Sequence, residues 1–287
     1  MTLSIATLPE RAVLGVEGAE AREFLHSLLT CDIRALKPGQ GAYGALLTPQ
    51  GKILFDLFTL ATETGFLLDA AASSADDLVK RLTMYRLRRK IEIAPRPELG
   101  VAAVWGGETA PDLEGVRVFR DPRADRLGWR AIGPRERLAA AATSDAETYD
   151  DHRLALGIAD SDRDIGSGQL FPHEANLDQL QGLSFSKGCF VGQEVVSRME
   201  HRGTARNRIV PVRFDGPPPA PETALTAGGR SLGRMLSGQD GRGLALVRLD
   251  RAEAARAAGE PLVADGTVVA VERPEWARYA MPATGAA

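Results

Sequence analysis

A run of prolines near residue 220 limits the folds open to this chain more than any other segment. The sequence there is Gly216-Pro217-Pro218-Pro219-Ala220-Pro221. Each proline fixes its own φ and lacks an N–H donor, so the segment favours a stiff, extended backbone and marks the clearest boundary in the chain. Short apolar segments with glycines between them lie around it, at 209–214, 233–237, 244–249 and 268–272. This spacing predicts a small β-barrel over residues 209–275.

Length and composition indicate a globular protein of more than one domain. The chain has 287 residues, 44% hydrophobic and 25% charged, and at about 150 residues per domain this predicts two domains. The net charge of -3 excludes a general polyanion binder. Two cysteines without CxxC or Cys/His spacing predict neither a disulfide scaffold nor a resident metal site. Because no basic leader or run of roughly 20 apolar residues is present, we expect a reduced, cytoplasmic protein.

Residues 1–208 alternate helix and strand patterns. Apolar residues spaced i, i+3, i+4, i+7 and i+8 predict a helix over 21–29, with Cys31 against its buried face. Strands are predicted at 43–47, 53–60, 66–69, 101–105, 116–119 and 128–132, and helices after Ser74, over 137–142 and from Ser144 toward 158. The polar segment 160–169 predicts a loop and 276–287 a disordered tail. The predicted class is α+β.

The least ordinary segment, FSKGCFVGQE, surrounds Cys189. Gly188 and Gly192 would allow positive-φ turns, while Lys187 and a helix starting near Gln193 would favour a thiolate. A reactive cysteine needs such surroundings. An inert, buried cysteine at a loop-to-helix junction is an equally open interpretation. A papain-type hydrolase is disfavoured, because no family signature surrounds the thiol and neither neighbouring histidine has an evident orienting partner.

A second group of candidate residues combines a guanidinium, a carboxylate and an amide. If Arg153, Glu174 and Asn176 converge, they can bind a planar heterocycle rich in donors and acceptors through bidentate hydrogen bonds. The alternative is structural: Glu174 and Asn176 would cap a helix, and Arg153 would pair on the surface.

Two basic runs complete the candidates. They comprise Arg81, Arg86, Arg88, Arg89 and Lys90, and then Arg198, Arg202, Arg206 and Arg208. Most such runs are solvated faces, although they can bind an anionic ligand tail or RNA phosphates. Without interleaved aromatic residues, nucleic-acid binding is not expected.

The segment Lys187-Gly-Cys-Phe-Val-Gly-Gln-Glu194 resembles the K-G-C-[YF]-x-G-Q-E signature of the YgfZ family, bacterial folate-binding proteins similar to a mitochondrial iron-sulfur assembly factor. Further similar segments occur in order between about residues 13 and 208: Phe24-Leu25 through Leu29-Thr30-Cys31-Asp32, 46–53, Tyr85-Arg86-Leu87-Arg88, 172–178 and His201-Arg202-Gly203.

The resemblance implies a ring like that of the glycine-cleavage T-protein: two α+β lobes within 1–208, the barrel at 209–275, and tetrahydrofolate in a central channel. It implies support of iron-sulfur cluster assembly or repair in [4Fe-4S] enzymes, with folate and the assembly machinery or its client enzymes as partners. Cys189 would be the functional thiol. The residues implied in cofactor binding are Arg153, Glu174, Asn176, Lys187, Gly188, Gly192, Gln193 and Glu194.

The main alternative is a folate-dependent aminomethyltransferase, which would be an enzyme, whereas an assembly factor need not be one. The T-protein carries paired acids after its glycine-rich turn, but the corresponding pair here is Phe55-Asp56. Arg153 resembles the folate-binding arginine of the T-protein, although some YgfZ-type proteins have tryptophan there. A third possibility is an interaction module that keeps the ring and binds no folate.

Overall fold

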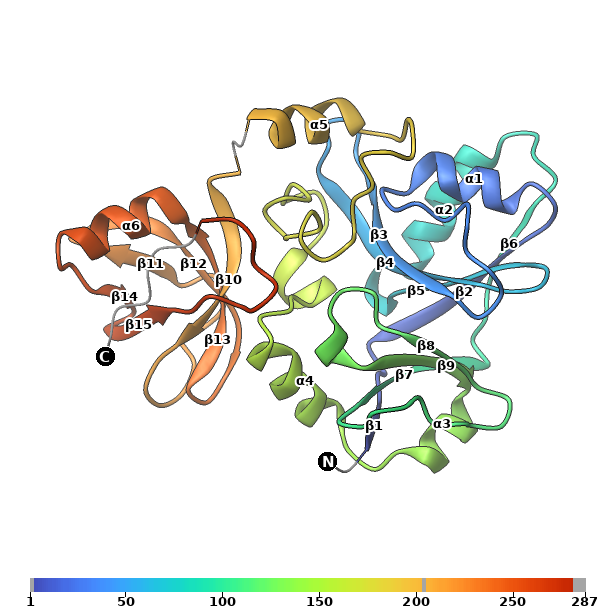
Figure 1. Cartoon of the computed structure of the whole chain (residues 1–287), viewed down its shortest axis with the longest axis horizontal. Helices are drawn as coiled ribbons and strands as arrows, with labels where there is room; N and C mark the ends of the chain where they lie inside the picture. Colours follow the sequence, from blue (N-terminus) through green and yellow to red (C-terminus); the bar gives the residue numbers. More distant parts are fainter. Residues whose placement is uncertain (1–2, 203–204, 281–287) are drawn as a thin grey trace.

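The computed structural model describes residues 3–202 and 205–280, which form three lobes (Figure 1). The first lobe is built on a five-stranded antiparallel sheet with the order β3 (Gly41–Leu47), β4 (Ile53–Ala61), β5 (Gly65–Ala71), β2 (Arg11–Glu17) and β6 (Glu92–Pro95). Helices α1 (Ala21–Leu28) and α2 (Ala75–Arg86) complete it. The α1 stripe predicted from the sequence is buried, and so is Cys31.

The second lobe has a four-stranded antiparallel sheet with helices α3 (Arg135–Ala141) and α4 (Ala146–Ala155) beside it. Its strand order is β1 (Ser4–Thr7), β7 (Leu99–Trp105), β9 (Trp129–Pro134) and β8 (Arg117–Arg120). Because β1 precedes the whole first lobe in sequence, the chain enters through the second lobe, builds the first, and returns. The two lobes are therefore interleaved in sequence.

The third lobe is a closed six-stranded barrel. Around it run β10 (Asn207–Arg213), β13 (Arg242–Arg248), β12 (Arg230–Gln239), β11 (Ala224–Ala227), β14 (Leu262–Ala264) and β15 (Thr267–Val271). The proline run connects β10 to β11, so it lies within the barrel lobe. The alanine-rich helix α6 (Leu249–Ala257), β11 and β14 were not predicted from the sequence, because each is short and buries few residues.

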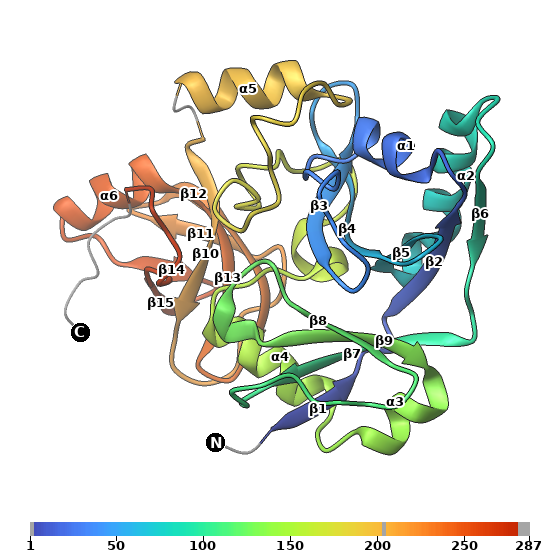
Figure 2. The same ribbon diagram turned by 45° about the vertical axis from the view of Figure 1, so that its right-hand side comes forward.

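Buried hydrophobic residues connect the three lobes. Their largest cluster includes Phe58 of the first lobe, Ile132 of the second and Leu244 of the barrel. Burial of this surface fixes the lobes around a common centre, which is the region where a ring-shaped relative would hold a ligand. Figure 2 shows the same arrangement turned by 45° about the vertical axis.

Several local predictions need correction. Helix α4 is capped by the Asp145 carboxylate, which accepts from the Thr148 N–H at 2.8 Å, and not by Ser144. The segment predicted as loop contains a π-helical turn at Ser161–Ile165, because the Asp160 side chain caps its first N–H groups. Within the expected tail, Ala277 is buried and Trp276 Nε1 donates to the Leu156 carbonyl, so this part of the tail is held against the body. Residues 281–287 lie outside the described residues, as does Gly203 of the similar segments.

Candidate functional site

Cys189 lies exposed in the segment between residues 185 and 192, directly before α5 (Gln193–Arg202). Lys187 anchors this segment to α1. Its buried ammonium donates to the carbonyl oxygens of His26 and Leu29, where α1 ends and a positive charge is favourable. The ammonium is thus committed to the α1 carbonyls and does not serve the Cys189 thiol as the sequence suggested.

The two glycines of the signature make the backbone turns expected of them. Gly188 has φ 97° and open space around it, whereas Gly192 has φ 80° and packs tightly. A Cβ on Gly192 would lie 2.7 Å from the carbonyl oxygen of Thr48 and 2.9 Å from Cα of Gly51. The β3–β4 turn therefore fixes the start of α5, and the Gln193 side chain accepts from the N–H of Phe190 at 3.3 Å.

The two thiols stand in opposite environments. Cys31 is buried, and burial raises the pKa of its thiol to about 12, against the smaller opposing effect of the Lys187 charge. Cys189 is exposed. The alternative of a buried cysteine is therefore wrong for Cys189, whereas the expected burial of Cys31 is confirmed.

A second feature is a cavity where the lobes meet, lined in part by Phe58 and three arginines. The guanidinium carbons of Arg130, Arg123 and Arg11 lie 3.9, 4.8 and 5.8 Å from the Phe58 ring centroid. Asp69, fully buried, pairs with Arg11 at 2.6 Å and with Arg130 at 2.5 Å. This cluster was not predicted from the sequence, because its members come from separate segments of two lobes and no local spacing connects them.

This inner cavity of about 70 Å³ adjoins an outer groove of about 500 Å³. Both are lined by Arg11, Asp150, Asp160, Ser161 and Arg163, and the groove also reaches Gly238 and Gln239 of the barrel. The combined space touches all three lobes. It lies in the size range of about 300–1,000 Å³ that is typical of small-molecule sites.

Asp56 is a buried acid that contacts Ser161 in the lining of the cavity. Its carboxylate accepts from the Ser161 hydroxyl at 2.9 Å and from the Tyr43 hydroxyl at 3.1 Å. Burial raises the pKa of Asp56, and the Arg11 charge and the Ser161 hydrogen bond only partly offset this. Phe55, its neighbour in the expected acid pair, belongs to the hydrophobic core on the other face of β4.

Arg153 borders the inner cavity, but most of its donors are already used. It is 2% exposed and donates to Asp150, Asp164, the Ile158 carbonyl and the Ser237 hydroxyl. The expected surface pair is therefore wrong: Arg153 connects α4, the π-helical turn and barrel strand β12.

Glu174 and Asn176 do not converge with Arg153. The Glu174 carboxylate accepts from Asn207 Nδ2 at 3.0 Å, and Asn176 Nδ2 donates to the Ile209 carbonyl at 2.7 Å. Both side chains attach the first barrel strand, β10, to the segment 166–192 that precedes α5, and neither lines the cavity or the groove. The exposed Glu194 pairs with Arg198 on α5, likewise away from the cavity. The eight residues implied in cofactor binding thus fall into three separate places.

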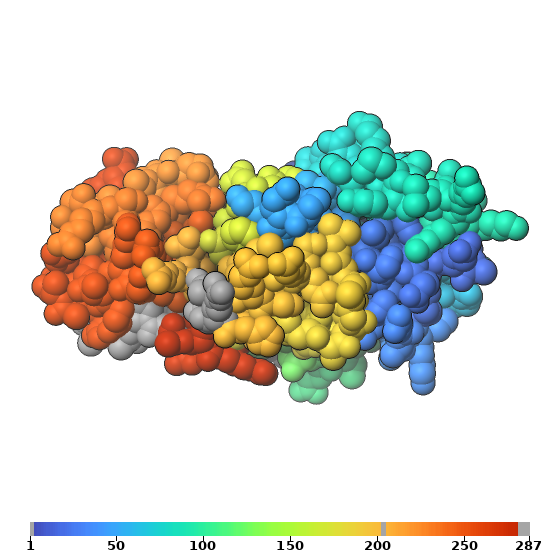
Figure 3. Space-filling view, turned by 90° about the horizontal axis from the view of Figure 1, so that it is seen from above, coloured from blue at the N-terminus to red at the C-terminus, as the bar shows by residue number. Residues whose placement is uncertain are grey.

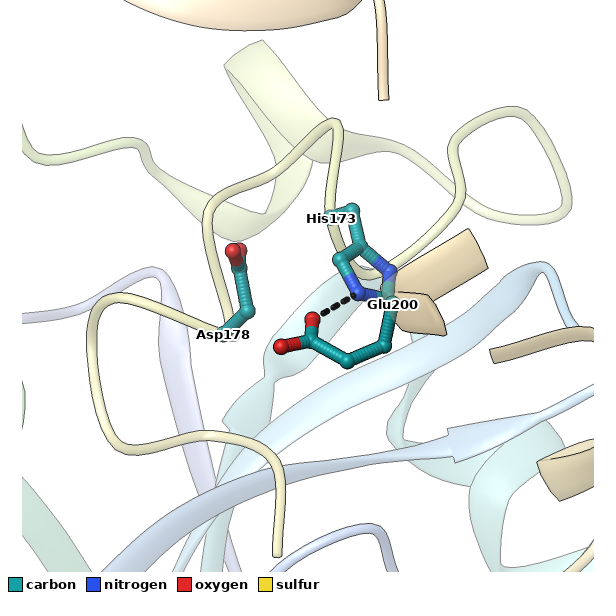
Figure 4. A group of neighbouring side chains, drawn as sticks. All are labelled: His173, Asp178 and Glu200. Carbon is teal, nitrogen blue, oxygen red and sulfur yellow. Dashed lines mark hydrogen bonds and ion pairs between the residues drawn. The ribbon is translucent and has the colours of Figure 1, made fainter. Parts of the chain in front are cut away.

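Three further side chains gather where α5 meets the segment 166–192 that precedes it (Figure 4). One ligand-type atom from each of His173, Asp178 and Glu200 lies within 4.8 Å of the others, and His173 Nε2 is 3.0 Å from Glu200. Arg208 already binds both oxygens of Asp178, at 2.6 and 2.9 Å. Because this guanidinium would stand beside any bound cation, the cluster suits an ion-pair network better than a metal ion.

Comparison with known proteins identifies the family. Human mitochondrial iron-sulfur cluster assembly factor IBA57 is 35% identical over 270 residues, covering 84% of this chain and 76% of the human protein. The chain belongs to the IBA57 family. The mouse protein is 36% identical with the same coverage, and the IBA57 homologue of Pyricularia oryzae is 31% identical over 92% of this chain and 76% of its own.

The comparisons also confirm the expected fold. Residues 206–279 match the family described as "CAF17, C-terminal beta-barrel domain". The aminomethyltransferase T of the Bartonella henselae glycine cleavage system superimposes with a TM-score of 0.75 over 96% of this chain and 86% of its own, at 19% identity. This chain therefore has the fold of the T-protein.

Two expectations change with these relatives. The expected relation to an iron-sulfur assembly family is confirmed. The family shown by these relatives is IBA57, and the YgfZ label is not confirmed. The expected cytoplasmic location is contradicted, because these IBA57 relatives are named as mitochondrial. Among the described residues, the helices are all too short or too polar to cross a membrane.

Proposed function

We propose that this chain supports assembly or repair of the clusters of [4Fe-4S] enzymes, and that Cys189 is the thiol acting in that process. One observation carries the proposal: the chain of an iron-sulfur assembly family exposes Cys189 on a segment anchored by Lys187 and Gly192. Cysteine thiolates are the usual protein ligands of iron-sulfur clusters. An anchored, exposed thiol can therefore reach a cluster that is held by another protein.

The number of cysteines in the chain indicates that cluster assembly requires a partner protein. A [4Fe-4S] cluster takes about four thiolate ligands, whereas the whole chain has two cysteines, of which Cys31 is buried. The cluster is therefore the cargo of this reaction, and the remaining ligands come from the assembly machinery or the client enzyme.

A reduced folate is the small molecule proposed for the central space. The outer groove has sufficient volume, and the carboxylate of Asp160 in its wall can accept from a ring nitrogen of a pterin. Phe58 and its arginines offer flat surfaces at the inner end. Bound tetrahydrofolate would supply one-carbon or redox chemistry; the chain's own groups would orient it and shield its ring from water.

Two measurements test the proposal. In a strain lacking its native homologue, this chain should restore the activity of [4Fe-4S] enzymes while leaving enzymes without clusters unchanged. Saturating tetrahydrofolate should raise the melting temperature of the purified protein, as a ligand bound only to the native state must. If the activity of [4Fe-4S] enzymes in that strain is the same with and without this chain, the proposed assembly role is wrong. If saturating tetrahydrofolate changes neither the fluorescence nor the melting temperature of the protein, the proposal of folate binding is wrong, and the chain is an interaction protein that binds no folate.

A further inference from the structure

The connection between α2 and β6 exposes apolar side chains on the same side of the molecule as Cys189. Among the described residues, large hydrophobic side chains are strongly exposed at Met84, Leu87, Phe185 and Val268. Leu87 is 83% exposed, Met84 is 55% exposed, and both belong to the end of α2. Phe185 belongs to the Cys189 segment. Exposed apolar groups of this size are common features of interaction sites.

Leu87 is held in a backbone conformation that leucine rarely adopts. Its φ is 52° and its ψ is -116°, and the Arg89 N–H donates to the Arg86 carbonyl across it at 3.1 Å. Leu87 therefore occupies the first central position of a type II′-like turn, where glycine is preferred. A leucine is strained there and gains no burial inside the protein. Its side chain is thus better explained by a contact outside this chain.

The surroundings of Leu87 are strongly basic. Arg88 and Lys90 are exposed, and within residues 3–202 and 205–280 neither they nor Arg81 form an ion pair. Leu87, Arg88, Arg89 and Glu20 line a shallow, open hollow of about 500 Å³. The chain as a whole is slightly acidic, so these unpaired cations form a local field of opposite sign. The complementary surface is an acidic one with an apolar recess for Leu87.

Helix α1 connects this region to the Cys189 segment. At its beginning, the Glu20 carboxylate accepts from the Lys90 N–H at 2.8 Å, and at its end the His26 and Leu29 carbonyls hold Lys187. The helix has eight residues and is therefore about 12 Å long. In Figures 1 and 2, α1 lies between the α2–β6 connection and the segment before α5, and Figure 3 looks onto this side of the molecule. A partner covering about 800 Å² would reach both regions.

We propose that these two regions form one docking face for an acidic iron-sulfur protein. The docking face comprises Met84, Leu87, Arg88, Arg89, Lys90 and Phe185. Leu87 inserts into the partner, the cations steer and orient it, and Cys189 then faces the cluster that the partner holds. The identity of the partner rests on the proposed function, whereas the docking face itself rests on exposure, strain and charge.

The test uses the full-length protein and the purified cluster-carrier proteins and apo-enzymes of the same organism, titrated by calorimetry at low and high ionic strength. Leu87→Gly is the informative variant: it relieves the turn strain, so the protein should melt at a higher temperature and yet bind at least about tenfold more weakly. Arg88→Glu should weaken binding and reduce its salt dependence. Val268→Ala, at an exposed apolar site on the barrel, is the matched control and should bind like the wild type.

Three results would overturn the docking face: wild-type affinity of Leu87→Gly, binding of RNA or anionic vesicles through these residues, or absence of binding to every iron-sulfur protein tested. Cys189→Ser separates this proposal from the proposed function. It should bind the partner with unchanged affinity while failing to support cluster enzymes. Retained enzyme support together with retained binding would refute the role of the thiol and keep the docking face.

Discussion

At the scale of single residues, the contrast between the two cysteines carries most of the functional argument. The thiol of Cys31 is buried and shielded from solvent, whereas the thiol of Cys189 is exposed and available. The apolar stripe over 21–29 correctly predicted the burial of Cys31, whereas the sequence left open whether Cys189 is exposed. The sequence assigned Lys187 wrongly, because a lysine two residues from a thiol suggests a local partner, whereas its carbonyl acceptors lie about 160 residues away in the chain.

Alkylation of the native protein near neutral pH should label Cys189 first. Burial withholds Cys31 from the reagent, and its pKa of about 12 leaves almost none of it as thiolate. Mass mapping of adducts over time checks this, with Cys189→Ser as the control that should remain nearly unlabelled until the protein is denatured. Labelling of Cys31 first, or of both at one rate, is incompatible with the structure.

Asp56 should make stability depend on pH in the direction opposite to most acids. Its pKa is raised in the folded state, so between its unfolded and folded pKa values the native protein binds more protons, and stability falls as pH rises through that window. Asp56→Asn should therefore melt higher than the wild type at neutral pH, and this advantage should disappear below about pH 4. The check is melting temperature across a pH series.

Asp56→Ala is the control for this series. It leaves the hydroxyls of Tyr43 and Ser161 without their acceptor, so it should be destabilised at every pH. An Asn variant less stable than the wild type at neutral pH would show that the carboxylate is well compensated in the folded protein.

At the scale of elements, the sequence predicted what local patterns encode and missed what distant contacts decide. Proline and glycine in the turn 48–51 sufficed for the β3–β4 hairpin, and the α1 stripe sufficed for its buried face. The predicted convergence of Arg153, Glu174 and Asn176 was wrong, because each of these side chains bonds to a barrel residue that no local pattern reveals.

The junction between the Cys189 segment and α5 offers a matched pair of glycine variants. Gly188→Ala meets only the unfavourable positive φ and should cost about 1 kcal/mol of unfolding free energy. Gly192→Ala also forces a methyl group against Thr48 and Gly51, and should cost about 2–3 kcal/mol. Denaturant unfolding gives both values, and hydrogen exchange should show the larger effect in α5. Equal effects would mean that the β3–β4 turn does not fix this junction.

At the scale of the whole molecule, three lobes are joined by buried hydrophobic residues and by buried polar contacts at their meeting point. The fold class, the barrel and the assembly family could all be predicted from the sequence, since glycine-punctuated strands and the signature around Cys189 are local features. The arrangement around Phe58 could not, because Arg11, Arg123 and Arg130 meet only after two interleaved lobes have closed.

Arg153 should matter more for holding the lobes together than for binding a ligand. Arg153→Ala leaves Asp150 and Asp164 buried with one partner fewer, and should cost about 3–5 kcal/mol of unfolding free energy. Arg163, half-exposed and paired with the same Asp150, is the control, and Arg163→Ala should cost at most about 1 kcal/mol. Denaturant unfolding compares the two. A fully stable Arg153→Ala protein that has lost tetrahydrofolate binding would restore the ligand role.

The central claim, that Cys189 is the working thiol of an iron-sulfur assembly factor, is tested most directly by cluster-enzyme activity in a strain lacking the native homologue. The strain would carry the wild-type chain, Cys189→Ser or Cys31→Ala. We predict that Cys189→Ser is folded and present at the wild-type level yet leaves [4Fe-4S] enzyme activity near that of the empty strain, whereas Cys31→Ala restores most of it. Full restoration by Cys189→Ser would contradict the claim and reduce the signature to a backbone turn built around Gly188 and Gly192.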